Sequence, residues 1–317
     1  MSTKPFRYIL FALLLLSLAS CKDFIEPSID KREVRLLAPG AHYQSKNYTV
    51  SFWWDEVEDA LTYRLQIVTP QFDTIGALVA DTIVKKNQLA LSLAPGLYQW
   101  RVRAENGSSQ TAFSVAGSFE VLYSSIKQQS VQLSSPGNNA LSNQGAVTFQ
   151  WGSMFGATRY RLQVDTNSFA DESKIIYNQP IAAQQYAFTF PKDQQYQWRV
   201  RAENDTAQSL WSSTRNIRSD HIPPGQVSLS SPGKGEVVAL PVSLQWGAVA
   251  TASAYKLYVL KADSTSAYNA SYPTIVSGLS SNFNLGNSGD RVYWKVSAVD
   301  AAGNEGQASV MRSFVIK

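Results

Sequence analysis

The strongest constraint on this chain is a repeat of about 97 residues that runs through almost its whole length. The segment VQLSSPG at residues 131–137 recurs as VSLSSPG at residues 227–233 and, more loosely, as VRLLAPG at residues 34–40. Self-similarity at a fixed period is the signature of one structural unit copied in tandem. The sequence therefore predicts three similar domains in a row.

Tryptophans stand at fixed places in each copy. In every copy a Trp is followed nine residues later by a Tyr, and a second Trp closes the copy. The first pairs are Trp54 and Tyr63, Trp151 and Tyr160, and Trp246 and Tyr255, and the second tryptophans are Trp100, Trp198 and Trp294. Because a buried Trp removes roughly 150 to 250 Å² from water, we expect the two tryptophans of each copy to meet in its core.

The apolar period within each copy is two, which is typical of half-buried strands. In residues 100–104 (WRVRA) apolar side chains alternate with arginines, so Trp, Val and Ala should point inward and both Arg toward water. Residues 63–67 and 160–164 follow the same pattern. No comparable stretch shows helical spacing with caps, so each copy is predicted to be an all-β, immunoglobulin-like sandwich of about 90 residues.

The repeat places the three domains at residues 34–122, 131–219 and 227–316. The joint at residues 220–226 contains the sequence IPPG, which favours extended polyproline geometry over free swivelling. The sequence therefore predicts a semi-rigid rod of three sandwiches.

These strands resemble fibronectin type III domains. The likeness rests on the Trp and Tyr of the second and third strands and on residues 93–102 (LAPGLYQWRV), because that family carries a Tyr after a Leu-x-Pro-Gly corner. The second copy keeps Pro191 and Tyr196 but lacks the Gly, and the third has Val292 at the Tyr position. The resemblance covers about 280 residues and implies a fold rather than a function.

The amino terminus reads as a lipoprotein signal. Lys4 and Arg7 precede a short apolar run, and residues 18–21 (LASC) resemble the bacterial lipobox, in which the Cys is lipidated and the preceding peptide is removed. We expect a signal peptide at residues 1–20 and a lipidated Cys21 with its tether at residues 21–33. The alternative is an ordinary signal peptide with a chance Cys.

The residues after Cys21 suggest where the protein is displayed. Lys22 and Asp23 resemble the surface-export signal of Bacteroidetes lipoproteins. The expected partner is a membrane, held through the lipid anchor. The expected location is the outer membrane, with the domains exposed on the cell surface.

Composition excludes several function classes. Cys21 is the only Cys, so a disulfide, a Cys-based zinc site and a thiol nucleophile are not expected in the mature chain. Loss of Lys4 and Arg7 leaves 26 basic against 24 acidic side chains, which does not favour a nucleic-acid partner. His42 and His221 lie in a turn and a linker. We therefore expect no catalytic residue, no cofactor and no metal site, and we predict that the protein is not an enzyme.

Three aromatic residues are candidates for ligand binding. At two outward positions where the first two copies carry Gln, the third copy carries Tyr258 and Tyr293, on strands that are neighbours in the fold. Trp53 stands beside the core Trp54 where the other copies also have Gln. Exposed aromatic rings suit stacking on a sugar or gripping a protein. The alternatives are cross-strand packing for the tyrosines and packing against the tether or a neighbour for Trp53.

Two functions follow from these observations. The first is a non-enzymatic, lipid-anchored cell-envelope protein that acts as a surface binding or adhesion rod or scaffold. The second is a carbohydrate-binding accessory lipoprotein of an outer-membrane glycan uptake system. In both, the extracellular ligand is an unidentified glycan or protein.

Overall fold

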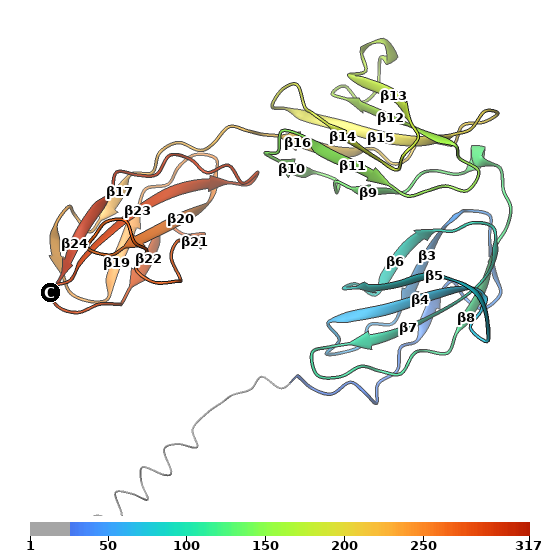
Figure 1. Cartoon of the computed structure of the whole chain (residues 1–317), viewed down its shortest axis with the longest axis horizontal. Coiled ribbons are helices and arrows are strands. Elements are labelled where there is room, and N and C mark those ends of the chain that lie inside the picture. The colour runs from blue at the N-terminus through green and yellow to red at the C-terminus, as the bar shows by residue number, and fades with distance from the viewer. Residues whose placement is uncertain (1–25) are drawn as a thin grey trace, which may run out of the picture. The chain divides into compact units, whose positions relative to one another are not determined.

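The computed structural model describes residues 26–317, and it is built almost wholly of β-strands. Each of three domains pairs a three-stranded sheet with a five-stranded sheet (Figure 1). The prediction of three tandem immunoglobulin-like, fibronectin type III-like sandwiches is confirmed. The signal peptide and Cys21 lie outside the described residues. Within residues 26–317, no helix has the length and apolar character needed to cross a membrane.

The first domain has sheets of order β1-β3-β6 and β2-β8-β7-β4-β5. Its strands are β1 (Leu36–Ala38), β2 (Tyr43–Ser45), β3 (Thr49–Trp54), β4 (Thr62–Gln71), β5 (Thr74–Val84), β6 (Gln88–Ser92), β7 (Gly96–Glu105) and β8 (Gly117–Val121).

The second domain repeats this plan with sheets of order β14-β11-β9 and β10-β16-β15-β12-β13. Its elements are the 3-10 helices η2 (Ile126–Gln128) and η3 (Glu172–Lys174) and the strands β9 (Leu133–Ser135), β10 (Ala140–Ser142), β11 (Val147–Trp151), β12 (Arg159–Asp165), β13 (Tyr177–Ile181), β14 (Gln185–Phe188), β15 (Gln195–Glu203) and β16 (Arg215–Ser219).

The third domain has sheets of order β17-β19-β22 and β18-β24-β23-β20-β21. Its strands are β17 (Leu229–Ser231), β18 (Glu236–Val238), β19 (Val242–Trp246), β20 (Ala252–Leu260), β21 (Thr274–Val276), β22 (Ser280–Phe283), β23 (Arg291–Asp300) and β24 (Arg312–Ile316). In all three domains a short second strand pairs in parallel with the last strand, as β2 does with β8.

All six repeated tryptophans are buried, which confirms their predicted place in the cores. In the first domain the ring centroids of Trp54 and Trp100 lie 6.5 Å apart. In the second, Trp198 packs against Phe149 at 4.6 Å. The aromatic residues fill the space between the sheets, so each small domain gains a large apolar core without a disulfide.

The Tyr nine residues after each first Trp has a shared structural role. The hydroxyl of Tyr63 accepts a hydrogen bond from the backbone N–H of Val57 at 2.9 Å. The equivalent bonds are Met154 N–H to Tyr160 at 2.9 Å and Val249 N–H to Tyr255 at 3.0 Å. The repeat thus preserves a buried ring whose hydroxyl fixes the preceding loop.

The corner predicted before Tyr98 and Tyr196 forms in the first two domains, at the start of β7 and β15. The Tyr98 hydroxyl donates to the carbonyl of Ala94 at 2.7 Å, and Tyr196 donates to the carbonyl of Lys192 at 2.9 Å. Val292 is fully buried at the equivalent place and has no hydroxyl to donate. There the turn is closed instead by the Asp290 carboxylate, which accepts from the backbone N–H of Asn287 at 2.8 Å.

Candidate binding surface

The outer face of the five-stranded sheet carries a ladder of arginines and aromatic rings in the first two domains. In the first, the Arg101 guanidinium lies 4.2 Å from the ring centre of Phe72 and 4.4 Å from that of Phe113. In the second, Arg199 lies 4.0 Å from Phe169 and 4.3 Å from Trp211. A guanidinium between two rings is held by cation–π attraction, so these ladders stiffen the sheet.

Glutamines complete both ladders. Gln66 accepts hydrogen bonds from Arg101 at 2.8 and 3.0 Å, and Gln163 accepts from Arg199 at 2.8 Å. Each Gln stands directly opposite its Arg on the neighbouring strand. The repeated outward Gln is therefore a structural partner of the Arg.

The third domain replaces this Gln–Arg pair with Tyr258 and Lys295, which stand directly opposite each other on β20 and β23. The Lys295 ammonium lies 5.1 Å from the centre of the Tyr258 ring, and the Lys256 ammonium lies 5.4 Å from it. Tyr258 donates its hydroxyl proton to Glu305 at 2.7 Å. Its ring is thus fixed between two cations and a carboxylate.

Glu305 is the centre of this cluster. Besides Tyr258, it accepts hydrogen bonds from Lys256 at 2.8 Å and Ser297 at 2.6 Å. Burial alone would raise the pKa of the Glu305 carboxyl, but these hydrogen bonds and the Lys256 charge outweigh burial and lower the pKa to about 2. Glu305 therefore stays ionised at any physiological pH and keeps Tyr258 in place.

Tyr293 lies diagonally to Tyr258. It stands opposite Leu260, two residues before Lys295 on β23. Residues in this relation lie about 7 to 8 Å apart on one face of a sheet, within reach of a single ligand. Both tyrosines are half-buried, so their rings are less exposed than the outward positions in the sequence suggest. Their role in binding stays a prediction.

Trp53 lies on the outer face of the three-stranded sheet of the first domain, and 51% of it is exposed. It stands opposite Ala38 and Gln88 on the neighbouring strands. The ring borders a shallow groove of about 390 Å³ that also involves Pro39 and Tyr43. Trp53 is thus accessible, and its use as a contact stays a prediction.

Sequence reasoning did not find the charged partners of Tyr258. Lys256 and Lys295 could have been found, because they hold outward positions next to core residues in the same alternating pattern. Glu305 could not, because it follows the end of β23 and reaches Tyr258 only after the loop folds back. Over residues 26–317 no group of three or more His, Cys, Asp or Glu side chains could hold a metal ion.

No family model and no curated protein matches the chain. Solved structures with similar folds include the FN1–FN3 domains of chicken CNTN1, at 17% sequence identity and a TM-score of 0.43, covering 90% of this chain and 97% of that chain. The fibronectin(III)-like modules of Clostridium thermocellum CbhA match at 16% identity and a TM-score of 0.23, covering 59% of this chain and 93% of that chain.

Proposed function

We propose that this protein is a non-enzymatic, lipid-anchored cell-envelope protein that binds an extracellular ligand through its third domain. The first two domains would serve as a scaffold between the anchor and the binding domain. Cys21, in the LASC segment, would carry the lipid, and display would be on the outer membrane surface. This plan resembles that of Bacteroidetes-type surface lipoproteins.

The observation that carries the proposal is the changed outer face of the third domain. Where the other two domains carry a ladder of Gln, Arg and aromatic rings on this face, the third carries Tyr258 and Tyr293 beside Lys256 and Lys295. Anchored aromatic rings flanked by charges are typical of contact residues, because they lose little conformational entropy on binding. The same combination suits a sugar ring, which needs an apolar face and hydrogen-bonding groups at its edge. A glycan uptake accessory is therefore the second candidate.

We expect Tyr258→Ala combined with Tyr293→Ala to weaken ligand binding by the mature chain at least about thirtyfold, the effect of removing one interface hot spot of about 2 kcal/mol. The measurement is a glycan and cell-surface protein array probed with the parent and the double variant. Binding of glycans only would favour the uptake accessory, and binding of proteins only would favour adhesion.

The matched control replaces Gln163 and Gln197, the equivalent residues of the second domain, with Ala. It should leave binding unchanged. Tyr258→Phe removes the hydroxyl that donates to Glu305 but keeps the ring. This variant should therefore retain most of the affinity for the ligand. Binding that survives the double variant, or that is lost in the Gln variant, contradicts the proposed surface.

Attachment is tested by Cys21→Ser. Two or more acyl chains hold a protein firmly on a membrane, whereas a Ser cannot accept the lipid at this site. The variant should therefore be lost from the membrane fraction or should keep its signal peptide and migrate as a larger species. Ser20→Ala, which retains the Cys and a small residue before it, should behave like the parent. Equal membrane retention and equal mobility of the Ser variant and the parent would contradict lipid anchoring.

A further inference from the structure

One open edge of the sandwich is closed by an arginine in the second and third domains. Arg215, the first residue of β16, donates to the backbone carbonyls of Leu133 at 2.6 Å, Ser134 at 3.0 Å and Pro136 at 2.7 Å. In the third domain Arg312, the first residue of β24, donates to the carbonyls of Ser230 at 3.0 Å and Pro232 at 3.3 Å. The guanidinium thus ties the first strand to the last across the two sheets.

The first domain has no side chain at this place. Gly117 is the first residue of β8 and stands opposite Trp100, as Arg215 stands opposite Trp198 and Arg312 opposite Trp294. A Cβ on Gly117 would lie 2.7 Å from Nε1 of Trp100 and 3.3 Å from the side chain of Leu36. Because the buried indole of Trp100 occupies this space, a residue with a side chain does not fit at position 117 without displacing the ring.

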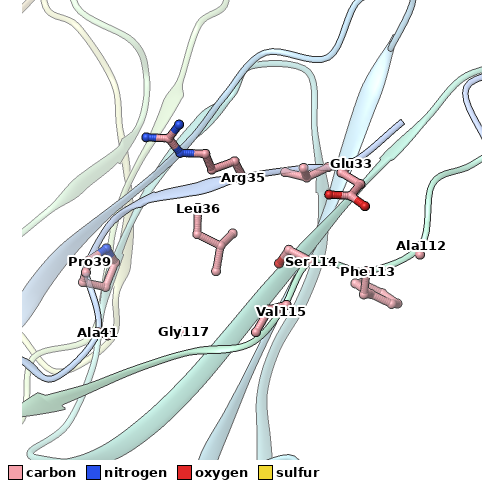
Figure 2. A pocket seen from close by; sticks show the side chains of 12 residues that line it. Glu33, Arg35, Leu36, Pro39, Ala41, Ala112, Phe113, Ser114, Val115 and Gly117 are labelled. Atoms are coloured by element: carbon pink, nitrogen blue, oxygen red, sulfur yellow. The ribbon is translucent and has the colours of Figure 1, made fainter. Parts of the chain in front are cut away.

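A cavity of about 540 Å³ lies where the arginine is missing. It opens between the start of the first strand and the segment that leads into β8 (Figure 2). Leu36 in its wall is half-buried, whereas Leu133 and Leu229, its equivalents, are buried. The volume falls within the range of small-ligand sites.

The carbonyl groups that bind the guanidinium elsewhere are repeated here. Leu36 and Pro39 line the cavity, and they occupy the places of Leu133 and Pro136 in the repeat. The first strand also keeps its register, because Leu36 stands opposite Trp54 as Leu133 stands opposite Trp151. Two residues whose carbonyls accept from Arg215 in the second domain therefore have counterparts in the wall of this cavity.

Charge at the cavity favours a cation. Glu33 and Phe113 lie toward one end, and Pro39 and Ala41 lie toward the other (Figure 2). Arg35, the one basic residue of the lining, extends away from the cavity, and its guanidinium lies 3.8 Å from the carboxylate of Asp55.

From these observations we propose that the cavity binds the side chain of an arginine presented by a separate protein or peptide. The guanidinium takes the place that Arg215 and Arg312 fill in the other domains and donates to the carbonyls of Leu36 and Pro39. The aliphatic stem lies on Leu36 and Val115, and Glu33 balances the charge. This site is separate from the Tyr258 surface and does not rest on the proposed function.

The test is a titration of the mature chain with the capped peptide acetyl-Gly-Arg-Gly-amide, followed by NMR of the backbone amides. We expect saturable shifts at Leu36, Val115 and Gly117 with a Kd of about 1 mM, which corresponds to a single anchored side chain. The citrulline peptide has the same shape without the charge, so it should bind about tenfold more weakly. Glu33→Gln should weaken the arginine peptide about two- to fivefold, the size of an exposed ion pair.

Arg215→Ala provides a gain-of-site control. It opens the equivalent edge of the second domain, so the arginine peptide should now also shift the amides of Leu133 and Thr214. The parent titration keeps the test valid if this variant unfolds. Equal binding of the arginine and citrulline peptides, shifts confined to other residues, or no shift at 10 mM peptide (about ten times the expected Kd) would overturn the proposal.

Discussion

Replacing Trp198 with alanine is expected to lower the free energy of unfolding of the second domain by about 3 to 5 kcal/mol. Trp198 is fully buried on β15 and packs against Phe149 with ring centroids 4.6 Å apart. Its removal forfeits the favourable free energy of burying the indole ring, and it leaves a cavity that the surrounding sheets only partly fill. A small domain is stable by only about 5 to 15 kcal/mol, so this loss removes much of its stability.

Hydrogen exchange of the full chain, read by mass spectrometry, resolves this effect domain by domain. Amides of the second domain should lose protection, whereas those of the first and third should keep it. Trp53→Ala is the matched control, because Trp53 is half exposed and its loss should change stability little. Unchanged protection in the Trp198 variant would mean that the ring does not support the core.

Replacing Glu203 with glutamine is expected to cost the second domain about 3 kcal/mol at neutral pH. Glu203 is only 2% exposed and is paired with Arg159 at 3.4 Å, Arg161 at 2.8 Å and Arg201 at 2.9 Å. Loss of the carboxylate leaves three like charges close together with no buried counter-charge. The arginines retain some contact with water, which places the effect at the lower end of the range for buried pairs.

The cost of this substitution should depend on pH. Burial raises the pKa of the Glu203 carboxyl, but the hydrogen bonds and charges of Arg161 and Arg201 outweigh it, so the pKa lies below its ordinary value of 4.5. A carboxyl whose pKa is lower in the folded state than in the unfolded state stabilises the folded state at pH values above the unfolded-state pKa. This stabilisation is lost as the pH falls through the folded-state pKa. The parent and the Gln variant should therefore differ most near pH 7 and converge in acid below about pH 4.5.

Urea unfolding of the two proteins between pH 7 and pH 3 measures this convergence. Glu105→Gln is the control, because Glu105 holds the equivalent place in the first domain and is paired with Arg103 at 2.8 Å. Fewer cations surround Glu105, so the loss of its carboxylate should lower the free energy of unfolding of the first domain by about 1 kcal/mol or less. A difference for Glu203→Gln that stays constant with pH would show that the carboxylate charge does not stabilise the domain.

Much of the fold could be predicted because each strand shows its own apolar alternation, and because the same pattern recurs in three copies. A strand with one buried face must alternate apolar and polar residues, so residues 100–104 reveal both the strand and its inward side. The Trp and Tyr spacing recurs because one core geometry recurs. The corner of Tyr98 was readable for the same reason, since its partner Ala94 lies four residues away.

The binding surface could be predicted only in part. The exchange of Gln for Tyr258 and Tyr293 is visible by aligning the copies, but the function of the replaced Gln is not. Only the paired strands show that Gln66 and Gln163 hold arginines, and that Lys295 stands opposite Tyr258. A residue's cross-strand neighbour depends on register, which a single strand does not specify.

The number of domains, their sheet-forming character and the residues of their cores could be inferred from the chain alone, because burial leaves a periodic pattern along it. Which distant groups meet depends on how the chain folds back on itself. Glu305 reaches Tyr258 across 47 residues, and Arg215 reaches Leu133 across 82. The cavity beside Gly117 lies where the first domain lacks the side chain that Arg215 and Arg312 supply in the other two domains, and it can be recognised only from the walls that surround it in the folded chain.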